Sequence, residues 1–347
     1  MDSFVKLPTT ERQQLFEEAA ARDGRMTAQL MEKDFWVCWT LRRLFQLESI
    51  HDHLTFKGGT SLSKVYGVIH RFSEDIDLSI ERDFLGFGGD HEPEAGQSGK
   101  EQQRRIKGLK QACQQILKDE VFPELTSVIK NQLKGGTESA LSLDENDADC
   151  QTLLFFYPAA VGSNLSTYFP QSIKIEFGAK SDHFPVEKAT VEPYFHTLIP
   201  SMLQDEVSEV RVLDAKRTFW EKATILHKEF HRSLDSPLPI RLSRHFYDLV
   251  QLADAEIGNE AIEEIEILNR VAEHKNVFFK TGWANYQDAK PGTLRLIPRD
   301  ERIAEIEADY ANMQPMFFGE APSFPTLLTR LGELEGTIND LGDKVRP

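Results

Sequence analysis

Residues 56–80 read FKGGTSLSKVYGVIHRFSEDIDLSI, and this stretch decides the fold of the first half of the chain. A Gly-Gly pair at 58 and 59 ends a short run, and Asp75 and Asp77 flank one apolar residue. Side chains two apart in a strand point to the same face, so the two aspartates project together while Ile76 and Leu78 point into a core. The stretch therefore predicts a strand ending in a turn, a helix over about 60–70, and a strand over 75–80.

The aspartate pair carries the first chemical indication. Two parallel carboxylates repel each other unless a cation neutralises them. Mg²⁺, or Mn²⁺ in its place, suits such a pair, because Mg²⁺ takes few protein carboxylates and completes its shell with phosphate oxygens and water. Taken alone, the pattern is more typical of an edge strand with a solvated acidic face.

The Gly-Gly turn supplies a second indication. Gly58 and Gly59 let the backbone approach a ligand closely, and Thr60 and Ser61 follow with hydroxyls and amides at the expected start of a helix. Backbone amides and the positive end of a helix dipole favour an anion. A plain strand-to-helix turn would also use glycine, but a turn of this kind followed by the aspartate pair predicts a phosphate site beside a metal site.

A second metal would require a third acid. Glu176 is the candidate, in the predicted strand 171–177, where Ile173, Ile175 and Phe177 alternate with Lys174 and Glu176. If this strand neighbours the strand at 75–80, Glu176 joins the aspartates. An ordinary amphipathic strand with a Lys–Glu face is the alternative interpretation.

The whole chain of 347 residues predicts an α/β fold of two domains. Residues 1–205 form a mixed α/β half with N-terminal helices, and residues 206–347 form a helical half that completes the active-site cleft. Outside the opening stretch, the patterns predict helices over 9–21, 27–47 and 100–121, strands over 152–159 and 171–177, and a surface loop over 135–150.

Charge and composition limit the partners and the location. The net charge of −16 excludes binding of nucleic acid over the whole surface, so an RNA partner would need a local basic patch. No stretch of 18 apolar residues predicts a membrane span, the N-terminus lacks a signal-peptide layout, and the odd, widely spaced cysteines favour a reducing compartment; we expect a cytoplasmic protein. Five basic residues are the candidates for an RNA patch: Arg104, Arg105, Lys107, Arg241 and Arg244.

The parts FKGGTS, SEDIDLS and KIEF together resemble the signature of the DNA polymerase β-like nucleotidyltransferase superfold. One departure is Glu74, which stands before Asp75 where the pattern has an apolar residue. More closely, the chain resembles the AbiEii/AbiGii toxin family of nucleotidyltransferases. Six motifs carry this resemblance: EKDFWV (32–37), KGGTSLSKVY (57–66), RFSEDIDLS (71–79), WEKATILH (220–227), RHFYDL (244–249) and FFKTGWANYQDAKPGTLRL (278–296).

The resemblance implies roles for individual residues. Ser73 contacts the triphosphate, Asp75 and Asp77 hold Mg²⁺, Lys222 reaches the phosphates, and Asp248 completes the active site. It implies transfer of a nucleoside monophosphate from an NTP to the 3′ end of tRNA, which blocks translation in toxin–antitoxin or abortive-infection phage defence. A cognate antitoxin encoded nearby is also implied, and direct contact with it is left open.

The helical patterns around these residues allow simpler interpretations. Lys222 falls at the edge of an apolar stripe, where a lysine binds an anion or extends to solvent. Asp248 is predicted on the face opposite its helix's core stripe, where Arg244 could form an ordinary surface pair with it. His227 and His231 lack a third metal ligand and are predicted as helix-surface histidines.

Two alternatives to the tRNA reaction remain at this level. The chain could transfer a nucleotide to a protein or a small molecule, which labelling of that acceptor would reveal. It could also be an idle nucleotide-binding module, although such a module would have no need of the aspartate pair.

Overall fold

The computed structural model describes residues 1–133, 140–162, 170–199 and 208–344. The chain divides into two compact units: Met1–Val65 with Phe72–Val212 (the first unit) and Tyr66–Arg71 with Leu213–Pro347 (the second unit). The predicted domain boundary at 205/206 lies outside the described residues. No helix in the described ranges is long and apolar enough to cross a membrane.

The first unit is built on a mixed seven-stranded sheet in the order β3-β4-β5-β2-β1-β7-β6, which confirms the α/β fold class. β2 pairs antiparallel with β1 and parallel with β5, and β4 pairs antiparallel with β3 and β5. The central position of β2 puts Asp77 between two strands, with Asp75 directly before the first residue of β2. The strands are β1 (Leu54–Lys57), β2 (Ile76–Ile80), β3 (Ala140–Leu143), β4 (Thr152–Phe156), β5 (Ser172–Gly178), β6 (Val186–Val191) and β7 (Ser208–Leu213).

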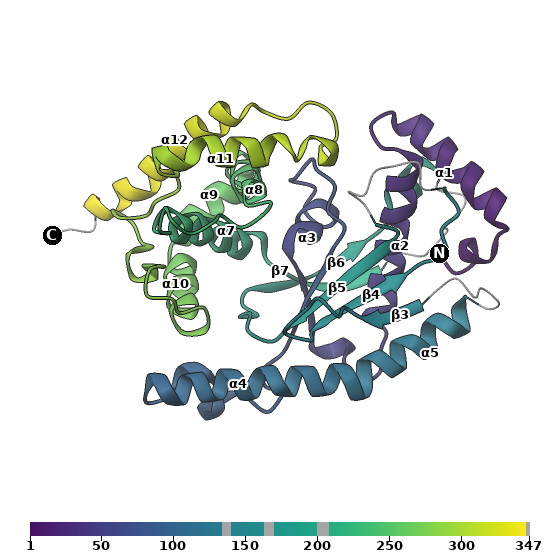
Figure 1. Ribbon diagram of the computed structural model, residues 1–347, viewed down its shortest axis with the longest axis horizontal. Coiled ribbons are helices and arrows are strands. Elements are labelled where there is room, and N and C mark those ends of the chain that lie inside the picture. The colour runs from purple at the N-terminus through teal and green to yellow at the C-terminus, as the bar shows by residue number, and fades with distance from the viewer. Residues whose placement is uncertain (134–139, 163–169, 200–207, 345–347) are drawn as a thin grey trace. The chain divides into compact units, whose positions relative to one another are not determined.

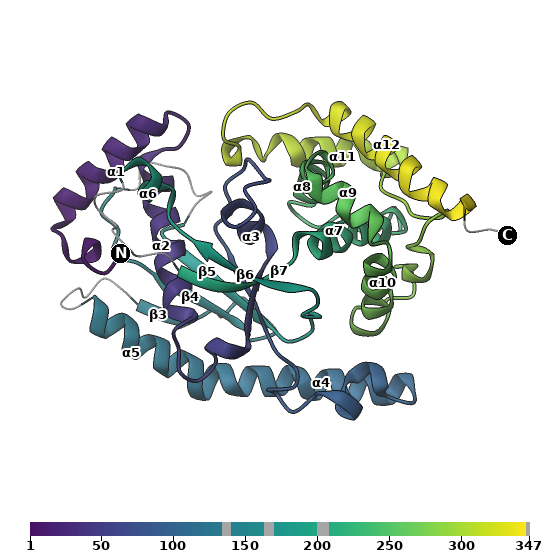
Figure 2. The ribbon, with the colours of Figure 1, turned by 180° about the vertical axis from the view of Figure 1, so that it is seen from behind.

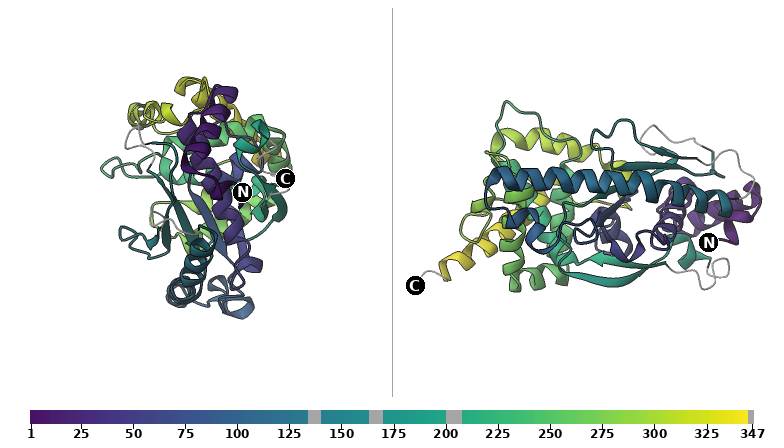
Figure 3. Two further views of the ribbon diagram at one scale, coloured as in Figure 1. Left: turned by 90° about the vertical axis from the view of Figure 1, so that its right-hand side faces the viewer. Right: turned by 90° about the horizontal axis from the view of Figure 1, so that it is seen from below.

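Helices cover this sheet. Trp36 and Trp39 of α2 lie with ring centroids 6.0 and 5.8 Å from that of Phe155 in β4. Figure 2 shows α6 beside α1 and α2, and Figures 1 and 3 show α4 and α5 as one long helical run alongside the sheet. The helices of the first unit are α1 (Thr9–Asp23), α2 (Ala28–Leu44), α3 (Gly58–Lys64), α4 (Gly99–Ile116), α5 (Phe122–Gln132) and α6 (Tyr194–Leu198); a π-helical turn (Leu117–Val121) joins α4 to α5, and short 3-10 turns lie at Phe4–Lys6, His51–His53, Gly89–His91 and Pro93–Ala95.

Some predicted elements differ from the structure. The helix predicted over 60–70 ends at Lys64, and residues 140–143 form β3 inside the predicted loop 135–150, of which 135–139 lie outside the described residues. β6 was not predicted because most of its side chains are exposed, so its sequence lacks the alternation that marks a half-buried strand.

The second unit is helical. Its helices are α7 (Ala215–Phe230), α8 (Ser243–Asp254), α9 (Glu256–Glu263), α10 (Glu266–Phe278), α11 (Asp300–Ala311) and α12 (Phe324–Lys344), with 3-10 turns at Tyr286–Asp288 and Gln314–Met316.

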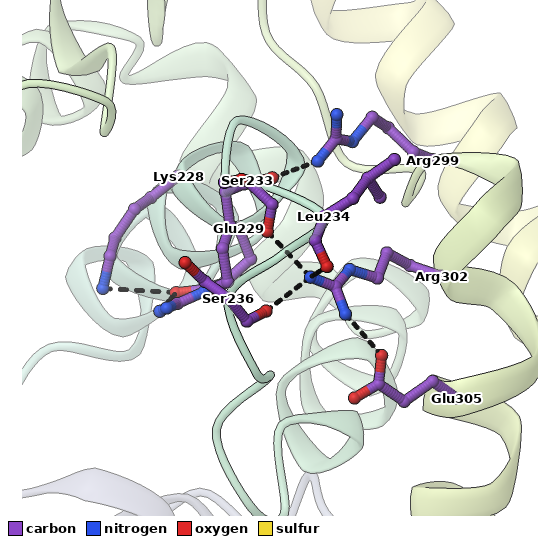
Figure 4. Close-up of polar contacts among 9 residues, drawn as sticks. Lys228, Glu229, Ser233, Leu234, Ser236, Arg299, Arg302 and Glu305 are labelled. Atoms are coloured by element: carbon purple, nitrogen blue, oxygen red, sulfur yellow. Dashed lines mark hydrogen bonds and ion pairs between the residues drawn. The ribbon is translucent and has the colours of Figure 1, made fainter.

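The connection between α7 and α8 is fixed by an arginine of α11. Figure 4 shows the guanidinium of Arg302 among the backbone carbonyls of Ser233, Leu234 and Ser236, to which it donates at 2.8, 3.0 and 2.5 Å. These three bonds come from Nη2 of Arg302, and its Nη1 donates to Glu305 at 2.6 Å. This arginine therefore restrains the loop between the two helices that carry Lys222 and Asp248.

Candidate active site

The aspartate motif has the alternation that the sequence predicts. Ser73, Asp75 and Asp77 are half-buried, whereas the intervening Glu74 and Ile76 are buried. Because successive side chains of an extended chain alternate in direction, the serine and both aspartates share one face. That face carries a hydroxyl and two carboxylates within one short segment at the start of β2.

Gly58 explains why the Gly-Gly turn precedes this face. Its φ is +83°, and a Cβ at this position would lie only 2.0 Å from Oδ2 of Asp77. Glycine is therefore required twice, for the left-handed backbone and for the room that the carboxylate occupies. The turn and the aspartate motif are thus in direct steric contact.

The two hydroxyls that follow the turn face inward. Thr60 is fully buried, and its hydroxyl donates to the backbone carbonyl of Asp75 at 2.6 Å and lies 3.0 Å from the Ser73 hydroxyl. The buried Ser61 hydroxyl donates to the Gly58 carbonyl at 2.9 Å. Within this arrangement both side chains hold the turn and the motif together, and the backbone amides at 58–61 are the groups that a phosphate would contact.

The neighbouring strands place one acid and one lysine directly opposite Asp77. Asp77 is in register with Glu176 of β5 on one side and with Lys57 of β1 on the other. Directly opposed residues of paired strands share a face. The neighbourhood that the Glu176 hypothesis requires is therefore present, and Lys57 joins it as a residue that the sequence did not single out.

Lys174 lies beside Glu176 and interacts with both Glu176 and Asp75. It forms an ion pair with Glu176, and although partial burial opposes the effect, its bond to Glu176 and the charge of Asp75 raise the pKa of Lys174. A hollow of about 440 Å³ lies beside this pair. Its lining includes Asp144, Asp147 and Asp149, so it would repel phosphate groups and favour neutral or cationic ones.

The face fits a lightly coordinated cation. In the described part of the chain, no group of three or more His, Cys, Asp or Glu side chains is arranged to hold a metal. Two half-exposed carboxylates beside a glycine turn nevertheless match the needs of Mg²⁺, which takes one or two carboxylates and receives its remaining oxygens from phosphate and water. Asp75 and Asp77 would hold such an ion, with Glu176 as the neighbouring acid.

Lys222 and Asp248 lie together in the second unit. Asp248 is fully buried and accepts from Nε and Nη2 of Arg71 at 2.7 and 2.8 Å and from Nζ of Lys222 at 2.7 Å. The predicted surface position of Asp248 is therefore wrong: residues 66–71 cover this side of α8, where the Tyr247 hydroxyl accepts from the His70 amide at 3.3 Å. Arg71, rather than Arg244, is its arginine partner.

Electrostatics favour one protonation state in this cluster. Burial alone would raise the pKa of Asp248, but the charges of Arg71 and Lys222 lower it well below its ordinary value. Burial lowers the pKa of Lys222, and Asp248 opposes that effect. Burial also lowers the pKa of His245 well below its ordinary value, and the nearby cations Lys222 and Arg244 add to this effect. Asp248 is thus an ionised counter-ion for two cations, and it is enclosed by them.

His227 is also misplaced by the surface prediction. It is fully buried: its Nε2 donates to the Asn285 carbonyl at 3.0 Å, and its Nδ1 accepts from the Arg295 amide at 3.1 Å. These bonds require the neutral ring, and burial lowers the pKa of His227 to about 4. Its neighbour His231 is half-buried.

The RNA candidates occupy varied positions. Arg104 and Lys107 are exposed on α4, whereas Arg105 donates to the carbonyls of Asp90 and Glu92 at 2.6 and 2.7 Å and therefore serves the local fold. Arg241 and Arg244 are half-buried around the start of α8. The Arg241 amide donates to Asp309 at 2.9 Å, with the Arg241 φ at +60°.

Sequence reasoning does not single out two residues of the site, Lys57 and Arg71, although both lie inside the motifs given above. Lys57 directly precedes the Gly-Gly pair, and pairing the strands 54–57 and 75–80 in sequence would have placed it opposite Asp77. Arg71 opens the motif RFSEDIDLS, but its partner is 177 residues away, beyond any local pattern.

Comparison with known proteins bears on these motifs. A family described as nucleotidyl transferase AbiEii toxin, type IV TA system, matches residues 39–330. No curated protein matches the chain. Among solved structures, the chain is similar to MenT4, a nucleotidyltransferase toxin from Mycobacterium tuberculosis H37Rv, with 16% sequence identity, a TM-score of 0.38, and coverage of 87% of this chain and 98% of that chain.

Proposed function

Because the chain belongs to the AbiEii family of nucleotidyltransferase toxins of type IV toxin–antitoxin systems, we propose that it transfers a nucleoside monophosphate from an NTP to the 3′ end of tRNA. The outcome would be blocked translation. The observation that carries the proposal is the shared face of Ser73, Asp75 and Asp77, placed against the glycine turn at Gly58.

The candidate site residues of the first unit each have a part in this reaction. The backbone at 58–61 and the Ser73 hydroxyl would bind the triphosphate, and Asp75 and Asp77 would hold Mg²⁺. The ion, when bound, would acidify the acceptor hydroxyl and stabilise charge on the leaving pyrophosphate. The acceptor hydroxyl would release its proton to solvent as its oxygen attacks the α-phosphorus in line; the bond from the α-phosphorus to the oxygen that bridges it to the β-phosphorus would break, and pyrophosphate would leave.

Lys222 would offset the charge of the triphosphate. This assignment rests on the family resemblance and on the chemistry of the side chain, an ammonium 8% exposed that Asp248 holds in one orientation. Asp248 itself is enclosed by Arg71 and Lys222, so we assign it as a positioning residue rather than as a base or a metal ligand.

The acceptor and the antitoxin belong to the same proposal. The exposed Arg104 and Lys107 of α4 would supply local positive charge for RNA on an acidic protein, and so would Arg244, which lies near Lys222. The antitoxin would be encoded nearby, without any assigned contact on this chain.

The test is transfer of label. The purified protein is incubated with bulk tRNA, Mg²⁺ and each of the four α-³²P-labelled NTPs, beside the variants Asp75→Asn and Asp52→Asn. Asp52 is the matched control, because its side chain is 79% exposed just before β1. Label on tRNA with the wild-type protein and Asp52→Asn, and none with Asp75→Asn, is the expected result.

Other outcomes identify the alternatives. Label on a protein or small molecule, with none on tRNA, would move the reaction to another acceptor. Nucleotide binding that needs no metal and survives Asp75→Asn, with no transfer to any acceptor, would indicate an idle nucleotide-binding module and refute the proposal.

A further inference from the structure

Three consecutive charged residues are buried in one turn of α2. Glu32, Lys33 and Asp34 are 1%, 3% and 3% exposed. Burying a charge costs free energy unless the charge is paired and hydrogen-bonded, so each of these side chains needs a partner close by in the fold. Their partners come from separate segments of the first unit.

Asp34 holds the glycine-turn helix. Its Oδ1 accepts from Nζ of Lys64, the last residue of α3, at 2.8 Å, and both side chains are 3% exposed. Its Oδ2 accepts from the Tyr194 amide at 2.7 Å, and the Lys64 ammonium lies 3.5 Å from the centroid of the Tyr194 ring. The helix that begins with the Gly-Gly turn is therefore fixed to α2 at its other end.

Lys33 holds the aspartate motif. Its ammonium forms an ion pair with Glu74, and the two side chains are 3% and 10% exposed. The same ammonium donates to the Pro170 carbonyl at 2.6 Å, two residues before β5 begins. One buried cation thus contacts the residue between Ser73 and Asp75 and the segment that leads into the strand of Glu176.

Glu32 completes the set. Its two oxygens accept from the amides of Ala160 and Val161 at 2.6 and 2.9 Å, in the segment after β4. The three side chains consequently join α2 to α3, to the aspartate motif, and to the segments flanking β4 and β5.

We infer that Lys33 and Glu74 are positioning residues, whose buried ion pair sets Ser73 and Asp75 at the distance from the glycine turn that a metal-bound triphosphate requires. Glu74 belongs to the inward-pointing row with Ile76 and Leu78, so its ion pair anchors the motif from behind while Ser73, Asp75 and Asp77 stay on the other face. This also accounts for the acidic residue at a position where the superfold pattern has an apolar one. The inference rests on the proposed function and adds the residues that align its site.

The experiment measures binding of each of the four NTPs in the presence of Mn²⁺ by calorimetry, without an acceptor. The variants are Lys33→Met, Glu74→Gln, Lys33→Arg, Asp75→Asn as the reference for loss of the metal site and, as matched control, Arg43→Met. Arg43 lies in the same helix and forms a partly buried pair with Asp2 at 2.7 Å, with side chains 6% and 28% exposed. Thermal unfolding of each variant is recorded in parallel.

We expect Lys33→Met to weaken Mn²⁺-dependent binding by about tenfold, the scale found when groups that orient metal ligands are removed. Glu74→Gln should weaken it in the same direction, and it keeps the shape of the side chain if Lys33→Met does not fold. Lys33→Arg should restore binding because it keeps a cation beside Glu74. Arg43→Met should lose stability but bind within about twofold of the wild-type protein.

Failure of the inference and failure of the proposed function give different results. If the wild-type protein binds, Asp75→Asn does not, and both Lys33→Met and Glu74→Gln bind as the wild-type protein does, then the pair is merely structural and the inference is overturned. If the wild-type protein binds no NTP with Mn²⁺, the proposed function is overturned, and the inference falls with it.

Discussion

Replacing Asp248 with Asn should destabilise the second unit strongly. Asp248 is fully buried and accepts three hydrogen bonds from two cations, at 2.7, 2.8 and 2.7 Å. A neutral amide would leave Arg71 and Lys222 buried without a counter-charge, and it would turn an NH₂ group toward a donor. Breaking a buried ion pair by removing one partner costs about 3–5 kcal/mol. This corresponds to at least about a hundredfold change in the unfolding equilibrium.

Urea unfolding followed by tryptophan fluorescence and circular dichroism measures this cost. Asp254→Asn is the matched control: it lies in the same helix and pairs with Arg330, but its side chain is 42% exposed and that of Arg330 is 46% exposed. Because exposed pairs contribute little, its cost should stay within about 1 kcal/mol. Equal losses for the two variants would refute the reasoning, since they would show that burial does not govern the contribution of the pair.

Three further predictions concern the site, the cation and pH. Gly58→Ala should abolish Mn²⁺-dependent NTP binding, because its Cβ would displace Asp77, whereas Gly24→Ala, with φ at +71° and no atom within 4 Å of the added Cβ, should lose stability only; calorimetry and thermal unfolding separate the two effects. Lys222→Met should remove transfer activity but destabilise the protein less than Asp248→Asn does, because Asp248 keeps both of its bonds to Arg71. A Lys222→Met variant as unstable in urea as Asp248→Asn would contradict this. Between pH 6.5 and about 4 the unfolded chain binds a proton at His227 that the folded chain excludes, so His227 should lower the free energy of unfolding by up to about 3 kcal/mol as pH drops through this window; His227→Gln should remove that contribution, and leave those of His183 and His245, in urea titrations at several pH values.

The side-chain alternation of the aspartate motif could be predicted from the sequence because its causes are local. Period-two alternation places Asp75 and Asp77 on one face, and β1, β2, β4 and β5 follow the apolar patterns that predict them. The register of Asp77 with Glu176 needed only one further condition, the adjacency of two strands. Strand β6 lacked any such pattern, because its exposed side chains do not alternate.

The charged partners could not be predicted because their causes are distant in sequence. Helical periodicity compares a residue with neighbours three and four positions away. It therefore paired Asp248 with Arg244, whereas the actual partners are Lys222, 26 residues away, and Arg71, 177 residues away. The pair of Lys33 with Glu74 is hidden for the same reason.

The surface prediction for Asp248 is wrong for a physical reason that also applies to the buried charges Glu32, Lys33 and Asp34 of α2. A helix with one apolar stripe was assumed to have one solvated face, but residues 246–250 of α8 are all buried, because residues 66–71 pack on the side opposite the core. When both sides of a helix are covered, a charged residue outside the stripe must find its counter-ion in the covering segment. The covering segment at α8 begins the motif RFSEDIDLS at Arg71, and the partner of Lys33 is Glu74 of the same motif. In both cases the counter-ion lies far along the chain from the buried charge, so the folded structure identifies it and helical spacing does not.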